Sequence, residues 1–253
     1  MIRIALLLVS LLLSACATQE KSVTPVEIKY GDFDAKAYFL KANELINAGQ
    51  LFEAKRLLEK IIAQDATKQY EPLARVRMAD TYYQQGGYEE AALEYERFLE
   101  LHSQHEYASL TQYRLAMCYY MQIKEVDTGY ELITKALKEF RKLQTAYPRN
   151  PYMEETEQRV QGCLNLLAEY ERYIGDFYYK KESYKAASLR YRGLLYDYPN
   201  FKNESEVLLK LGKTYINMGE QHRAIETFRS IIQRYPRSEQ AEEAQKLISS
   251  LAM

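Results

Sequence analysis

The feature that most constrains this chain is a set of three packing positions that recurs five times. Each copy has a small residue, an alanine 12 positions later (20 in the third copy), and a leucine or aromatic residue four beyond that alanine. Successive small residues stand 37, 37, 59 and 37 positions apart. The sets are Ala42, Ala54 and Leu58; Ala79, Ala91 and Tyr95; Ala116, Ala136 and Phe140; Gly175, Ala187 and Tyr191; Gly212, Ala224 and Phe228. Small residues let helices cross closely and large ones fill the layer between neighbours, so the spacing predicts stacked helical hairpins.

The endings of three copies support the same unit. Tyr147-Pro148, Tyr198-Pro199 and Tyr235-Pro236 close helix-like segments, and each proline lies 12 residues after the alanine of its copy. Proline cannot continue a helix from within, because it lacks the N–H and clashes with the preceding turn. Apolar residues recur at three- and four-residue spacing, and no segment alternates as a strand would, so we expect an all-α chain. The pattern resembles the tetratricopeptide repeat and implies a solenoid of five helix–turn–helix units over roughly residues 35–251.

The remaining segments set the domain boundaries. Residues 1–15 hold Arg3 and then an apolar run too short to span a membrane, which predicts a signal peptide. Residues 16–32 are polar and are expected to form a flexible tether. Units 1–3 then occupy residues 33–149, and units 4 and 5 occupy residues 150–253. Asn150 and Pro151 indicate a helix cap followed by the first helical residue, and predict a long helix from about 151 to 180. Gly162 within it is expected to mark a close crossing or a slight bend.

The signal peptide ends in Leu13-Ser14-Ala15-Cys16, which resembles the bacterial lipoprotein box. In that family the cysteine thiol is alkylated with diacylglycerol, and cleavage leaves the cysteine as the first residue. The resemblance implies a covalent lipid on Cys16, attachment to the membrane through that lipid, and no other cofactor. Ala17 stands where aspartate favours inner-membrane retention in enterobacteria, so we expect the outer membrane. The alternative is a cysteine that follows an ordinary signal by chance.

Composition and motifs limit the function classes. Loss of the signal peptide leaves 33 Lys and Arg against 35 Asp and Glu, a balance that argues against nucleic acid as a partner. The chain has no glycine-rich phosphate loop and no Gly-x-Ser-x-Gly elbow, so we do not expect an enzyme. His102 and His105 could hold a metal by spacing, but they lack a third ligand, and solvated loop histidines are the favoured interpretation. Cys118 and Cys163 occupy packing positions; export permits a disulfide, but two free, buried thiols are favoured.

A longer stretch resembles the BamD family, the lipoprotein subunit of the machine that folds β-barrel proteins into the bacterial outer membrane. The resemblance is carried by the lipoprotein signal, the five units, the long helix that opens unit 4, and residues 136–200, ALKEFRKLQTAYPRNPYMEETEQRVQGCLNLLAEYERYIGDFYYKKESYKAASLRYRGLLYDYPN. It implies a periplasmic scaffold that binds the periplasmic repeats of BamA, other lipoproteins of that machine and the C-terminal signal of unfolded outer-membrane proteins. Unit 1 departs from the family because it ends QDATKQYEP, without Tyr-Pro, and the loop Gln122–Tyr130 is shorter than in many relatives. A lipoprotein that serves pilus assembly or cell-wall enzymes is the alternative.

The repeat register also places candidate binding residues. In tetratricopeptide repeats the first helix of each pair lines the concave face through positions three before, one after and four after the small anchor. In units 1–3 these positions form a tyrosine-rich track that would suit a peptide of alternating apolar residues with a terminal aromatic: Phe39, Asn43, Ile46, Val76, Asp80, Tyr83, Tyr113, Met117 and Tyr120. The alternative for each residue is packing against a neighbouring unit. Units 4 and 5 offer a more charged set: Arg172, Asp176, Tyr179 and Lys213.

The second helix of unit 4 carries Arg190 and Arg192 beside its packing stripe. In the BamD family an arginine nine residues before the closing proline contacts the last periplasmic repeat of BamA, which implies that role for Arg190. Arginine suits such a contact because its planar fork can hold a carboxylate with two hydrogen bonds. The alternatives are a solvated arginine or an intrachain ion pair with Asp197 or Glu182.

Overall fold

The computed structural model describes residues 33–199 and 201–251, and in these ranges helices are the only regular secondary structure. The signal peptide, Cys16 and the tether lie outside the described residues. Residues 34–253 form one compact unit by themselves. No helix in the described ranges combines the length and the apolar character needed to cross a membrane.

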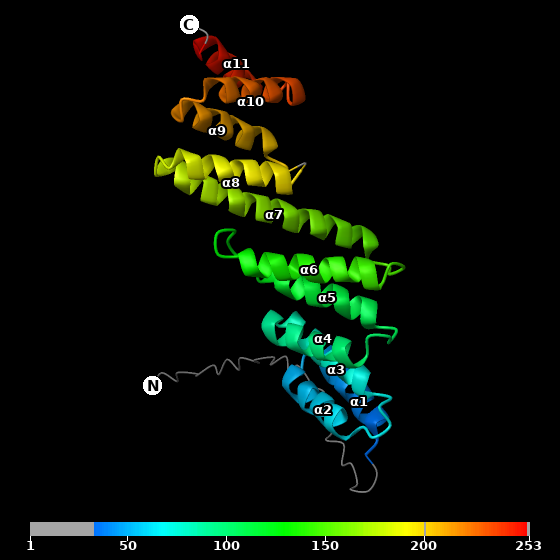
Figure 1. The fold of residues 1–253 in the computed structure, drawn as a ribbon. Helices are drawn as coiled ribbons and strands as arrows, with labels where there is room; N and C mark the ends of the chain where they lie inside the picture. The colour runs from blue at the N-terminus through cyan, green and yellow to red at the C-terminus, as the bar shows by residue number, and fades with distance from the viewer. Residues whose placement is uncertain (1–32, 200, 252–253) are drawn as a thin grey trace, which may run out of the picture. The chain divides into compact units, whose positions relative to one another are not determined.

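Eleven helices succeed one another in the described ranges, and each packs mainly on its neighbours in chain order (Figure 1). They are α1 (Ala35–Asn47), α2 (Leu51–Gln64), α3 (Glu71–Gln84), α4 (Tyr88–Leu101), α5 (Ala108–Met121), α6 (Tyr130–Ala146), α7 (Met153–Lys180), α8 (Tyr184–Asp197), α9 (Glu204–Asn217), α10 (Gln221–Arg234) and α11 (Glu239–Leu251). The all-α solenoid of helix–turn–helix units is confirmed. Helix α11 follows the fifth pair as a further helix, which the count of five units did not include, and it packs on both α9 and α10.

The spacing of 37 residues follows from constant element lengths. A regular unit has two 14-residue helices and a three-residue turn, and a six-residue connection leads to the next unit. Unit 3 is longer because its turn, residues 122–129, has eight residues and α6 begins three residues earlier relative to its alanine anchor. Helix α7 has 28 residues because 14 residues precede the part that matches a regular first helix. These additions account for the 59-residue spacing between Ala116 and Gly175.

The repeated anchors form the core of the unit. Every anchor that has a side chain is fully buried, with 0% of its surface exposed. The two glycine anchors make room for aromatic rings: a Cβ on Gly175 would lie 2.5 Å from Cε1 of Tyr191, and a Cβ on Gly212 would lie closer still to the ring of Phe228. Because interiors are packed as densely as crystals, these glycines have no room for even a methyl group.

The Tyr-Pro endings act as expected on the helices. Helices α6, α8 and α10 each end directly before Tyr147, Tyr198 or Tyr235, because the residue that precedes a proline is pushed out of the helical region. The cap predicted at Asn150 needs a correction. Asn150 Oδ1 does accept a hydrogen bond from the N–H of Tyr152 at 2.7 Å, but α7 begins only at Met153, so Pro151 precedes the helix.

Candidate peptide-binding and partner-binding surfaces

The centre of the tyrosine-rich track lies on α5, where Tyr113 and Tyr120 are two turns apart on one face. The ring of Tyr113 stacks on the ring of Tyr152, with centroids 5.0 Å apart. The ring centroids of Tyr113 and Tyr120 lie 6.1 and 6.3 Å from that of Phe140. Tyr113 and Tyr120 are half-buried. They therefore keep part of their aromatic surface available to a ligand, while Phe140 supports them from below.

The structure corrects three of the nine positions predicted to line this track. Val76, Asp80 and Met117 are buried. Val76 packs in the cluster that α3, α4 and α5 form, and Met117 in the cluster of α5, α6 and α7. The first helix of each unit lies so close to the next unit that these side chains are covered, which is the packing alternative. The other six residues, Phe39, Asn43, Ile46, Tyr83, Tyr113 and Tyr120, are half-buried, and their role in binding stays a prediction.

Asp80 has a structural task at the joint between units 2 and 3. Its Oδ1 accepts a hydrogen bond from the hydroxyl of the fully buried Tyr95 at 2.6 Å and pairs with the guanidinium of Arg114 on α5. A buried phenol needs such a partner. Burial, and then the neighbouring Asp80 carboxylate, raise the pKa of Tyr95 far above its usual range, so the phenol keeps its proton. The group links α3, α4 and α5.

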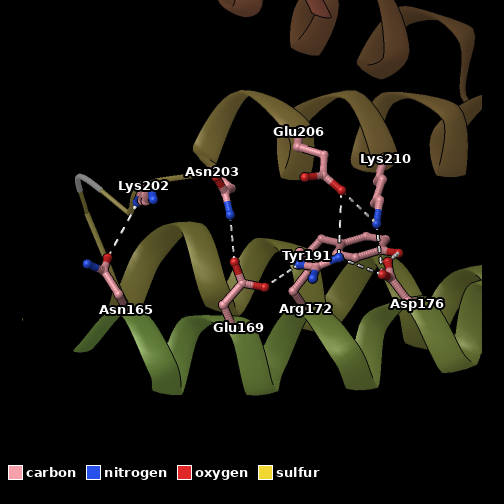
Figure 2. Close-up of polar contacts among 9 residues, drawn as sticks. All are labelled: Asn165, Glu169, Arg172, Asp176, Tyr191, Lys202, Asn203, Glu206 and Lys210. Carbon is pink, nitrogen blue, oxygen red and sulfur yellow. Dashed lines mark hydrogen bonds and ion pairs between the residues drawn. The ribbon is translucent and has the colours of Figure 1, made fainter. Parts of the chain in front are cut away.

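The same arrangement recurs at the last joint between units, where unit 4 packs on unit 5 (Figure 2). Asp176 accepts a hydrogen bond from the hydroxyl of Tyr191 at 2.6 Å, and its other oxygen lies 2.7 Å from Lys210 Nζ and 3.0 Å from Arg172 Nη1. Arg172 also contacts Glu169 at 2.6 Å, and both cations approach Glu206. In each joint the aspartate directly follows a small anchor, and the cation stands two residues before the next small anchor.

These ion pairs occupy the charged side chains of units 4 and 5. Arg172 and Asp176 contact each other and their neighbours. Lys213 lies 2.7 Å from Glu243, and the hydroxyl of Tyr179 accepts a hydrogen bond from Asn217. The charged set in these two units is therefore satisfied within the chain, and it offers a ligand less than its composition suggests.

A second surface lies on the solvent side of α8. Arg190 is 46% exposed and its Nη1 lies 3.1 Å from Oε2 of Glu171 on α7. The intrachain pair is thus made with Glu171, which corrects the expected alternatives Asp197 and Glu182. Arg192 is exposed and makes no ion pair in the part of the chain that is described.

The α8 surface also exposes large apolar side chains. Leu189 is 60% exposed and Tyr196 is 86% exposed. Together with Arg192 they stand at helical spacing, so the three form one stripe that faces solvent. Sequence reasoning missed Leu189 and Tyr196. The sequence did indicate Leu189, because it stands two residues after the alanine anchor, a position where units 1, 3 and 5 have the charged residues arginine, lysine and glutamate.

His102, His105, Cys118 and Cys163 lie in the described ranges and pack within the fold. His102 is half-buried, its Nε2 lies 2.8 Å from Oε2 of Glu71, and its ring packs on Phe98; His105 also packs on Phe98, so the expectation of solvated histidines is corrected. Among the described residues no three side chains are grouped to hold a metal. Cys118 and Cys163 are free and buried, and burial raises the pKa of each thiol to about 12, which makes them poor nucleophiles at neutral pH.

Comparison with known proteins identifies the family. Residues 32–224 match the family model YfiO, described as outer membrane lipoprotein. The relatives include outer membrane protein assembly factor BamD of Rickettsia prowazekii, 25% identical over 97% of this chain and 96% of the relative. The BamD of Neisseria meningitidis serogroup A is 24% identical over 90% of this chain and 89% of the relative.

The solved structures that are similar include YrrB, a TPR protein with an unusual peptide-binding site. It is 17% identical, with a TM-score of 0.40, over 84% of this chain and 92% of that protein. The match to the family model covers most of the helical unit. The resemblance to BamD proteins is confirmed, and the chain belongs to the YfiO family of outer membrane lipoproteins.

Proposed function

We propose that this chain is an assembly factor for outer-membrane β-barrel proteins and acts as a scaffold without enzymatic activity. The observation that carries the proposal is the likeness to BamD assembly factors along nearly the whole chain. In this role Cys16 carries the lipid that holds the protein to the periplasmic face of the outer membrane. The stacked units would then bind BamA, other lipoproteins of the machine and unfolded barrel proteins.

The partner-binding surface in this proposal is the solvent side of α8. Leu189 and Tyr196 supply apolar area, and Arg190 and Arg192 supply charge beside it. Interfaces are typically anchored by aromatic and arginine side chains, which fits this composition. The pair between Arg190 and Glu171 is partly exposed, with 46% of the Arg190 side chain and 23% of the Glu171 side chain open to solvent. Exchanging Glu171 for a carboxylate of the BamA periplasmic repeats would therefore cost less than breaking a buried pair.

The peptide-binding surface in this proposal is the half-buried part of the track in units 1–3. It comprises Phe39, Asn43, Ile46, Tyr83, Tyr113 and Tyr120. The C-terminal signal of an unfolded barrel protein would place apolar side chains against these rings. Burying one aromatic side chain contributes about 1.5–3 kcal/mol before the peptide's ordering cost is subtracted.

Charge reversal at the α8 surface tests the partner proposal. We expect that Arg190→Glu greatly reduces co-purification of BamA, and that the exchange Arg190→Glu with Glu171→Arg does not restore it. The exchange rebuilds the intrachain pair in the opposite direction, so it would restore the complex only if that pair were the purpose of Arg190. Arg223→Glu on α10 is the matched control, because Arg223 is similarly exposed and paired with Glu220 at 2.7 Å. Undiminished BamA with Arg190→Glu, at an unchanged melting temperature, would remove this surface from the interface.

A further inference from the structure

Arg159 on α7 differs from the other arginines of residues 33–199 and 201–251. Arg75, Arg114 and Arg172 are also half-buried, and each pairs with at least one carboxylate. Arg159 is the half-buried arginine that has no acidic partner within this part of the chain. Shielding a charge from water is unfavourable unless a partner compensates it. The position therefore holds a cation whose counter-charge the described fold does not supply.

The surroundings of Arg159 are aromatic. It stands in the 14-residue extension of α7, and its Cζ lies 5.0 Å from the ring centroid of Tyr120, a cation–π contact. Tyr120 reaches α7, because its hydroxyl would lie 3.5 Å from a Cβ on Gly162. This is an ordinary van der Waals distance that leaves room for a methyl group, so the close crossing expected at Gly162 stays a prediction. Burial works against the charge on Arg159, but contacts with Tyr120 and Tyr113 outweigh it and raise its pKa, so the guanidinium stays charged.

Tyr152, which directly precedes α7, stacks on Tyr113, and Tyr113 lies on the same face of α5 as Tyr120. The extension thus brings both an additional ring and a guanidinium to the part of the track where Tyr113 and Tyr120 lie. A ligand that fits here has an aromatic or apolar group beside a negative charge. The C-terminal residue of a peptide has this combination when its side chain is aromatic, since its carboxylate is separated from its ring by a few bonds only.

We propose that Arg159 binds the terminal carboxylate of the peptide whose last side chain lies against Tyr113 and Tyr120. The inference rests on the proposed function, since it takes peptide binding by the track as given. The guanidinium fork can hold a carboxylate through two parallel hydrogen bonds, and the flanking rings keep it oriented. Recognition then requires a free C-terminus, so the same residues inside a longer chain would bind more weakly.

The test compares one peptide with two ends. The probe is a short fluorescent peptide of alternating apolar and polar residues that ends in phenylalanine, made as the free acid and as the C-terminal amide. Binding is measured to the full mature chain purified in detergent. We expect the free acid to bind about tenfold or more tighter, since a hydrogen-bonded charge pair contributes that much. Arg159→Gln should bind both forms equally and weakly, and Arg159→Lys should keep part of the preference.

Arg141→Gln is the matched control, because Arg141 is an exposed arginine on α6 without an ion pair in the described ranges. It removes the same charge and should keep the full preference for the acid. If the wild-type chain binds acid and amide equally well, the role of Arg159 is refuted while peptide binding by the track stands. If it binds neither form, the peptide part of the proposed function is refuted as well. A preference for the acid that survives in Arg159→Gln would also overturn the inference. If that variant does not fold, equal binding of acid and amide by the wild-type chain would still refute the inference.

Discussion

Asp65 closes the first unit where units 3–5 use Tyr-Pro, and its replacement should weaken the N-terminal units. It directly follows α2 and is only 3% exposed. Its Oδ1 accepts hydrogen bonds from the N–H of Thr67 at 3.0 Å and from the Thr67 hydroxyl at 2.6 Å. Its Oδ2 accepts from the N–H groups of Tyr70 at 2.7 Å and Glu71 at 3.0 Å, where α3 begins. One carboxylate therefore orders the connection and caps the next helix.

The magnitude follows from the donors that Asp65→Ala would leave without an acceptor. Loss of a helix-capping side chain costs about 1 kcal/mol and up to about 2. The N–H of Glu71 is in a buried residue, and an unsatisfied buried donor costs about 1–3 kcal/mol. Water can reach the more exposed Thr67, so its two bonds add little. We expect the free energy of unfolding of the N-terminal units to fall by about 2–4 kcal/mol.

The effect of Asp65 should also depend on pH. Burial disfavours the charged carboxylate, but the hydrogen bonds from Thr67, Tyr70 and Glu71 outweigh it and lower the pKa of Asp65. A group with a lower pKa in the folded state stabilises the fold above its unfolded pKa, and this contribution is lost as the pH falls through the folded pKa. The difference in stability between wild type and Asp65→Ala should therefore shrink in acid.

The measurement is urea unfolding followed by circular dichroism, with hydrogen exchange of the amides in α2 and α3 to locate the change. Exchange is needed because repeat arrays open unit by unit, so a single transition is not assured. Asp127→Ala is the control, since Asp127 is exposed in the loop of unit 3. A loss of less than about 0.5 kcal/mol, the usual size for a surface change, or a loss that does not shrink in acid, would refute the capping role.

Two further predictions concern single backbone positions. The turn of unit 4 places Glu182 at φ 59°, where the turns of units 1, 2 and 5 place glycine at φ 75–76°. Because only glycine adopts this left-handed conformation without a steric cost, Glu182→Gly should raise the free energy of unfolding by about 1 kcal/mol. A lower melting temperature would contradict this. Gly212→Ala should lower the free energy of unfolding by about 1–3 kcal/mol, because the new methyl group overlaps the ring of Phe228. Adding Phe228→Leu should recover part of this loss, and urea unfolding of both variants measures it.

The fold was predictable from the sequence because the packing positions depend on residue size alone. A small residue, an alanine and a large apolar residue at fixed spacing define where two helices cross, and each of these positions is buried. The long α7 was predictable from its uninterrupted helical pattern. The first residue of α7 was not predictable. The Asn150 side chain accepts a hydrogen bond from the N–H of Tyr152, two residues further on, and this bond forms a turn that precedes the helix.

The task of Asp80 was missed because the concave-face rule considers position alone. An aspartate directly follows the small anchor in units 2 and 4, where the large anchor is Tyr95 or Tyr191. The units with leucine or phenylalanine as the large anchor have Asn43, Met117 or Lys213 there. The pairing of aspartate with tyrosine was therefore visible within this one sequence. Arg159 was not predictable in the same way, because the extension of α7 lies outside the repeat register and only its packing places it beside Tyr120.

The joint between units 3 and 4 explains why the proposed carboxylate site lies where it does. The joints on either side use an aspartate, a tyrosine anchor and a cation from the next unit. At the middle joint the corresponding residues are Met117, Phe140 and Tyr173, so it lacks both the internal carboxylate and the cation at that position. The extension of α7 supplies apolar contacts and Arg159 instead. A carboxylate at this joint would have to come from outside the described fold, and the terminal carboxylate of a bound peptide would provide it.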